Sequence, residues 1–89
     1  MPRTISERRR ATRIPASGRV EVSFKDPTLV TVEAELAETS ATGFRIVHQS
    51  QALISGLEIS LHRDKDTRRA RVVWTHVLEG RRVSGCLLM

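Results

Sequence analysis

The sequence has a single cysteine and no long apolar run. Cys86 is the one cysteine of the 89 residues, which excludes an internal disulfide, and its apolar surroundings in GCLLM predict a small packing residue. No apolar segment approaches the ~18 residues of a membrane-spanning helix, and the N-terminus MPRTISERRR lacks the apolar centre of a secretory signal. We therefore expect one small domain in the reducing cytoplasm, without membrane insertion.

Aromatic residues are also scarce, at 3% of the chain. Proteins that bind single-stranded nucleic acid stack successive bases on aromatic side chains, and phosphate backbones require an extended basic surface. Between residues 20 and 89, nine basic and nine acidic residues cancel. Both facts argue against the interpretation of the chain as a small basic β-barrel that binds RNA or DNA.

The excess positive charge is confined to the N-terminal segment. Residues 1–19 contain six arginines and one glutamate, which account for the whole formal net charge of +5. No lysine occurs there, although a solvated tail would accept lysine equally well. The planar guanidinium binds phosphate or a guanine edge through two hydrogen bonds, so an all-arginine segment indicates a partner with phosphates or bases. The six are Arg3, Arg8, Arg9, Arg10, Arg13 and Arg19.

Alternation of apolar and polar residues dominates the rest of the chain and predicts strands. No segment shows a convincing helical period, and residues 49–56 form a looser connection. Short connections favour an antiparallel barrel, because closure removes exposed strand edges. Trp74 shares a predicted strand face with Ala70 and Val72, so we expect it to pack in or near the core. The predicted strands are 18–25, 28–38, 44–48, 57–62, 68–77 and 81–89.

The first stretch with side chains suited to ligand binding is RRATR, which holds Arg9 and Arg13. It lies in a predicted N-terminal arm, residues 1–17, ahead of a barrel formed by residues 18–89. Pro15 restricts Ile14 to an extended conformation, which argues against a continuous helix in the arm. Such an arm can wrap a ligand and aim arginines at it. The alternative interpretation is a flexible, solvated basic leader.

The second stretch is ETSATG, residues 38–43, between two predicted strands. Ser40 offers a hydroxyl donor and acceptor. Gly43 permits a positive φ or the close approach of a ligand to the backbone. Glu38 offers a carboxylate that accepts from the N1 and N2 hydrogens of guanine. The alternative interpretation is an ordinary polar hairpin turn, for which these residue types are common.

In this order, and about 25 residues apart, the two stretches resemble the signature of the PilZ domain family. That signature is Arg-x-x-x-Arg in an N-terminal arm, then (Asp/Asn)-x-Ser-x-x-Gly at a strand turn. The later RRARVVWTHVLEGRRVSGCLL resembles the closing strands of the family, so the resemblance extends from about Glu7 to Met89. Glu38 departs from the pattern, because it keeps the carboxylate but adds one methylene to the usual Asp or Asn.

The resemblance implies a six-stranded antiparallel β-barrel of the split-barrel type, all-β, with a flexible arm and little or no C-terminal helix. It also implies that the barrel binds the bacterial second messenger cyclic di-GMP. Arg9 and Arg13 then contact phosphate oxygens and the O6/N7 edge of guanine. Ser40 and Gly43 line the ligand contact, and Glu38 faces guanine.

Two further sets of contacts complete this expectation. In the family, arginine just before the first motif arginine favours an intercalated ligand dimer, so Arg8 predicts two cyclic di-GMP molecules per domain. Arg10 and Trp74 are possible secondary contacts. The chain would then be a stand-alone receptor in which the ligand orders the arm onto the barrel and alters the interaction with an unidentified protein partner.

A second interpretation comes from another functional class. A PilZ-like barrel that has lost the ligand would act only as a protein-interaction module, and the glutamate at position 38 favours it. We expect no enzyme, because no nucleophile–base pairing or glycine-rich phosphate loop is visible. We also expect no metal cofactor, since His48, His62 and His76 lack the spacing of zinc ligands.

Overall fold

The computed structural model describes residues 14, 15 and 17–89, and all of its elements are strands. The prediction of an all-β fold is confirmed for this part of the chain. None of these residues forms a helix with the length and apolar character needed to cross a bilayer. The strands are β1 (Ile14–Pro15), β2 (Arg19–Lys25), β3 (Leu29–Thr39), β4 (Gly43–His48), β5 (Glu58–Arg63), β6 (Asp66–Leu78) and β7 (Arg81–Leu88).

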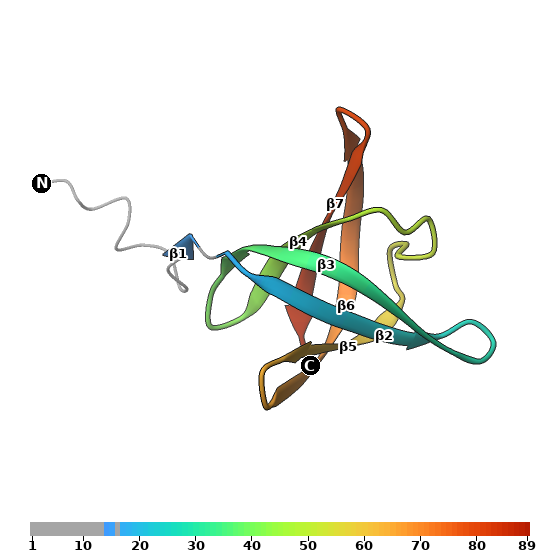
Figure 1. Ribbon diagram of the computed structural model, residues 1–89, viewed down its shortest axis with the longest axis horizontal. Helices are drawn as coiled ribbons and strands as arrows, with labels where there is room; N and C mark the ends of the chain where they lie inside the picture. Colours follow the sequence, from blue (N-terminus) through green and yellow to red (C-terminus); the bar gives the residue numbers. More distant parts are fainter. Residues whose placement is uncertain (1–13, 16) are drawn as a thin grey trace, which may run out of the picture.

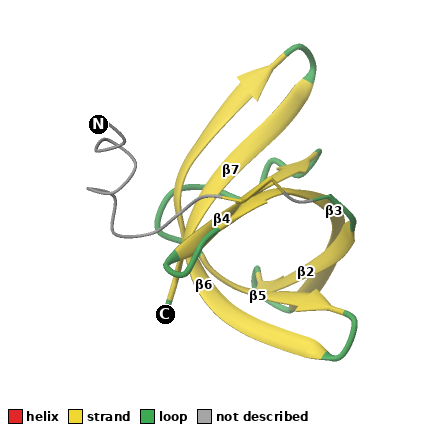
Figure 2. Ribbon diagram, turned by 90° about the vertical axis from the view of Figure 1, so that its left-hand side faces the viewer, coloured by secondary structure: helices red, strands yellow, loops and turns green. Residues whose placement is uncertain are grey.

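Six of the described strands close into an antiparallel barrel, as predicted. Around the barrel the order is β3, β2, β5, β6, β7 and β4, and the pairing of β4 with β3 completes the circle. The curved ribbons in Figures 1 and 2 show this closure. β1 pairs with the last residues of β3, beyond the end of the pairing between β2 and β3. Closure gives every barrel strand a partner on both sides, which is how small all-β domains avoid free edge strands.

Inward-facing apolar residues of all six strands fill the barrel. Val22 of β2 and Ile46 of β4 are completely inaccessible to solvent, and burial of side chains of this size stabilises a fold by about 1.5–3 kcal/mol each. The connection 49–57 adds Leu53, which is 1% exposed. The other core residues are Val20, Phe24, Ala34, Leu36, Phe44, Ile59, Leu61, Ala70, Val72 and Cys86.

The hairpin of β6 and β7 extends beyond the barrel wall. Figures 1 and 2 both show its tip projecting away from the other strands. The turn consists of Glu79 and Gly80, which have φ angles of 53° and 78°. Positive φ at both central residues matches the turn type that follows the natural twist of a two-residue hairpin.

Two β-bulges interrupt the alternation of the strands. The register shifts in β3 between Leu36 and Glu38, and in β6 between Val72 and Trp74. Each bulge adds one residue, so the residues after it change sides of the sheet. These two bulges move Glu38 and Trp74 to the outer surface of the barrel.

The bulge in β6 overturns the expectation that Trp74 shares a face with Ala70 and Val72. Trp74 pairs with Gly85, and both chain neighbours of Gly85 are buried in the core. Position 85 therefore faces outward, and so does its partner. Strict alternation from Val72 cannot reveal this, because the extra residue reverses the pattern.

Candidate functional site

Four side-chain positions on neighbouring strands form one line across the outside of the barrel, which we call the outer row. Glu38 of β3 pairs with Arg45 of β4, Arg45 pairs with Gly85 of β7, and Gly85 pairs with Trp74 of β6. Because Gly85 has no side chain, Arg45 and Trp74 meet above it. The Cζ atom of Arg45 lies 5.8 Å from the centre of the Trp74 ring, a cation–π distance.

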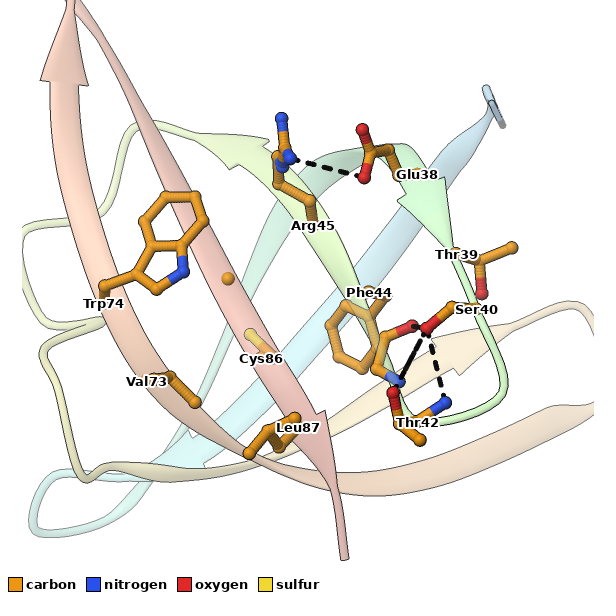
Figure 3. Close-up of a pocket in the computed structure, with 12 residues that line it drawn as sticks. Glu38, Thr39, Ser40, Thr42, Phe44, Arg45, Val73, Trp74, Cys86 and Leu87 are labelled. Carbon is orange, nitrogen blue, oxygen red and sulfur yellow. Dashed lines mark hydrogen bonds and ion pairs between the residues drawn. The ribbon is translucent and has the colours of Figure 1, made fainter. Parts of the chain in front are cut away.

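A cavity of about 140 Å³ opens beside the outer row. Four residues that the sequence nominated line it, namely Glu38, Ser40, Gly43 and Trp74. Figure 3 shows Glu38 and Ser40 on one side of the cavity and Trp74 on the other. The fold thus brings together residues that are up to 36 positions apart in the sequence.

Ser40 builds the turn between β3 and β4. Its backbone N–H donates to the carbonyl of Gly43 at 2.9 Å. Its hydroxyl oxygen accepts from the backbone N–H groups of Thr42 and Gly43, each at 3.3 Å. The hydroxyl therefore turns toward its own loop, as in other serine-stabilised turns, and it fixes the rim of the cavity.

Gly43 is required by the approach of β7 rather than by an unusual φ angle. A Cβ atom at this position would collide with the backbone carbonyl oxygen of Cys86. That atom belongs to the neighbouring strand, because Phe44 pairs with Cys86 and Gly43 with Leu87. Glycine at the end of the ETSATG stretch thus lets β4 and β7 close over the core.

Arg45 is a site residue that the sequence did not reveal. Its Nη2 lies 3.3 Å from Oε1 of Glu38, and the two side chains are 35% and 27% exposed. Its Nε is buried and has no hydrogen-bond acceptor within the described structure. Arg45 lies between two buried residues of β4, so the sequence pattern indicates only that it faces outward. The bulge in β3, which the pattern does not reveal, sets it opposite Glu38.

The position of Trp74 depends on the connection before β5. The Ser55 hydroxyl donates to the carbonyl of Val73 at 2.8 Å, and the Gly56 N–H donates to the carbonyl of Val72 at 2.7 Å. In return, the Val72 N–H donates to the carbonyl of Leu57 at 2.9 Å. These bonds satisfy the backbone groups of the bulge and so hold Trp74 on the outer face.

The indole of Trp74 is half-buried. It covers Gly85 so closely that a Cβ there would collide with the ring. It also stacks on His76, with ring centres 4.7 Å apart and planes inclined by 30°. Trp74 thus forms the wall of the cavity opposite Glu38 (Figure 3).

β1 joins the arm to the same region. Ile14 pairs with Thr39, and Pro15 pairs with Glu38, and both of these β3 residues line the cavity. The chain that precedes Ile14 therefore connects to the barrel beside the outer row. The predicted ligand contacts of the arm, namely Arg8, Arg9, Arg10 and Arg13, lie outside the described residues.

A separate series of hydrogen-bonded polar side chains lies inside the barrel. His48 contacts Ser84 through Nε2 at 2.7 Å, and its Nδ1 accepts from the Ser50 N–H at 3.1 Å. Ser84 contacts the hydroxyl of Thr75 at 2.6 Å, which donates to the carbonyl of Leu53 at 2.7 Å. Each of these side chains has a hydrogen-bond partner, so the series acts as a structural network. Burial, and the nearby charge of Arg82, lower the pKa of His48.

Cys86 also lines the cavity, and its thiol is buried. Burial raises the pKa of the Cys86 thiol to about 12, so the thiol stays protonated at neutral pH. No three His, Cys, Asp or Glu side chains among residues 17–89 gather as metal ligands would. The polar and aromatic chemistry at the cavity therefore comes from a carboxylate, a guanidinium, an indole and the hydroxyls of Thr39, Ser40 and Thr42.

Comparison of the chain with models of known protein families and with curated protein sequences found no match. Functional assignment therefore rests on the sequence motifs and on the residues of the cavity. The outer row, the Ser40 turn and the junction with β1 all meet there.

Proposed function

We propose that this chain is a PilZ-type receptor that binds cyclic di-GMP at the cavity beside the outer row. The observation that carries the proposal is that two distant segments, the ETSATG turn and Trp74, line one cavity. The strand β1, which directly follows the RRATR stretch, pairs with Glu38 and Thr39 at the rim of that cavity. The resemblance of both stretches to the PilZ signature supplies the ligand.

The cavity offers suitable chemistry for a guanine base. The Glu38 carboxylate accepts from the N1 and N2 hydrogens of guanine, and the Trp74 indole offers an aromatic surface for stacking. Arg9 precedes Ile14 by five residues, so an extended chain allows it to reach up to about 17 Å from β1. That reach covers the ligand phosphates, which Arg9 and Arg13 bind as bidentate donors.

The arm supplies the regulatory element of the proposal. Arg8 adds a further guanidinium, which helps to neutralise four phosphates and thereby favours two ligand molecules per domain. Ligand binding orders the arm against the barrel, and a protein partner in the cytoplasm reads the change. The receptor carries out no catalysis itself.

One observation favours the second candidate, a PilZ-like interaction module without ligand. Glu38 already pairs with Arg45 at 3.3 Å, so a ligand must compete for this carboxylate. The substitution Glu38→Asp separates the candidates, because it restores the usual family residue. A large gain in affinity for cyclic di-GMP would identify a degenerate site, whereas a change below about threefold supports an intact one.

Calorimetric titration with cyclic di-GMP tests the proposal directly. Arg9→Ala and Arg13→Ala should each abolish binding or weaken it strongly. Arg19→Ala is the matched control, since Arg19 is 73% exposed and pairs with Glu33 on β3. Absence of binding heat for the unmodified protein at high micromolar ligand would rule the proposal out.

The ligand count is tested by a separate variant. Arg8→Leu should lower the number of cyclic di-GMP molecules bound per domain from two to one. An unchanged count in this variant would contradict the role given to Arg8, while the receptor function itself would stand.

A further inference from the structure

Arg45 contacts Glu38 and Trp74, the two side chains that the proposed function assigns to the binding of a guanine base. Its Nη2 lies 3.3 Å from the Glu38 carboxylate, and its Cζ lies 5.8 Å from the centre of the Trp74 ring. Figure 3 shows the Arg45 side chain between the two, at the cavity. A base that donates to both carboxylate oxygens of Glu38 and stacks on the indole must compete with Arg45 for Oε1 and for the ring.

A guanidinium and the Watson–Crick edge of guanine present similar chemistry. Guanine itself contains a guanidine unit, in which N1 and N2 carry parallel N–H donors in one plane. A carboxylate accepts from either group through two hydrogen bonds. Both groups are also flat and bind aromatic surfaces. An arginine set between a carboxylate and an indole therefore imitates a bound guanine.

We infer that Arg45 is a built-in competitor of the guanine base and thereby sets the affinity of the site; this inference rests on the proposed function. Ligand reaches Glu38 and Trp74 only after Arg45 has left them. The position that Arg45 holds is costly, because its Nε is buried and has no hydrogen-bond acceptor within the described structure. That cost makes Arg45 a weak competitor, which a ligand of matching chemistry can displace.

The decisive variant is Arg45→Met, which keeps an unbranched apolar stem and removes the guanidinium. Arg19→Met is the matched control for the lost positive charge, because Arg19 is 73% exposed and outside the residues that line this cavity. Relative to the control, Arg45→Met should bind cyclic di-GMP roughly fivefold to tenfold more tightly, the factor for one partly exposed ion pair and one cation–π contact. Arg45→Gln should change affinity in the same direction.

Each result of this titration has a distinct meaning. Binding of the control and the Arg45 variants with equal affinity, or weaker binding by the variants, would overturn the inference and leave the receptor function intact. Binding by none of the proteins, although their unfolding curves show that they are folded, would remove the proposed function and the inference together. Binding by the Arg45 variants alone would show that Arg45 closes a guanine site in the unmodified protein; the competition by Arg45 would then stand, while the receptor function of the unmodified chain would be ruled out.

The contact between Arg45 and Trp74 can also be tested without nucleotide. Trp74 is the one tryptophan of the chain, so its fluorescence reports on this contact. Quenching by acrylamide should become more efficient in Arg45→Met than in Arg19→Met, because the guanidinium no longer covers the ring. Equal quenching in the two variants would show that Arg45 does not shield the indole, and the inference would fail.

Discussion

Trp74 lies directly on Gly85, its cross-strand partner in β7. The glycine leaves room for the indole, and the indole shields the glycine backbone, a known way to stabilise glycine in a sheet. The same gap lets Arg45 approach the ring from the other neighbouring strand. One missing side chain thus creates the contact on which the outer row depends.

The substitution Gly85→Ala should displace Trp74. A Cβ at position 85 would collide with three atoms of the indole, so the ring must rotate or the strands must separate. We expect a loss of about 1–3 kcal/mol in the free energy of unfolding, as for other overpacked sites. Urea unfolding, followed by circular dichroism, measures it.

A double-mutant cycle identifies the origin of that loss. If the indole is the obstacle, Trp74→Ala should largely suppress the effect of adding a methyl group at Gly85. The two substitutions would then be strongly non-additive. Additive losses would show instead that Gly85 is needed for a reason other than the contact with the ring.

The substitution Gly43→Ala should be more damaging than Gly85→Ala. The obstacle at Gly43 is the backbone carbonyl of Cys86, and a backbone atom cannot rotate away as a side chain can. We expect the pairing of β4 with β7 to loosen, with a loss above about 3 kcal/mol. Comparison of the two alanine variants by urea unfolding checks this order, and a smaller loss for Gly43→Ala would contradict it.

The strands were predictable from the sequence because each strand has one solvent-exposed side and one side buried in the barrel. Alternation in segments such as LEISLH indicates the buried side directly, and all six barrel strands coincide with a predicted segment. The ETSATG turn was also predictable, because serine and glycine at these positions suit a tight connection. Fold class and the main rim of the cavity thus follow from local patterns.

The outer row could not be predicted in the same way. Its assembly needs an extra residue in β3 and another in β6, and each reverses the alternation that reveals the strands. The bulge at Val73 is held by Ser55 and Gly56, 18 and 17 positions earlier in the chain. Because these contacts are long-range, the local alternation assigns Trp74 to the wrong face. It also does not reveal that Arg45 lies opposite Glu38.

The substitution Ser55→Ala should loosen the bulge that positions Trp74. It removes the hydroxyl that donates to the Val73 carbonyl at 2.8 Å, and the loss should be about 0.5–1.5 kcal/mol in unfolding free energy. Trp74 fluorescence should change as well, because the ring loses part of its support. The control Ser60→Ala changes a serine of β5 that does not line the outer-row cavity. An identical tryptophan spectrum for both variants would contradict this role of Ser55.

The stability of the protein should fall as the pH drops below 6.5, because His48 is held in its neutral form. The Ser50 N–H donates to Nδ1, so that nitrogen must remain unprotonated while Nε2–H faces Ser84. Burial, followed by the charge of Arg82, lowers the pKa of His48 from its ordinary value of 6.5. The unfolded chain therefore binds a proton more readily than the folded one.

This difference fixes the sign and range of the effect. The contribution of His48 to stability is fully present above pH 6.5, the ordinary pKa of histidine, and is lost as the pH falls from there toward the lowered pKa. Urea unfolding at about pH 7.5 and about pH 5.5 should show the loss in the unmodified protein and in His76→Gln, which alters an exposed histidine. In His48→Gln the loss should shrink, since glutamine does not titrate. An equal loss in all three proteins would assign the pH dependence to other groups.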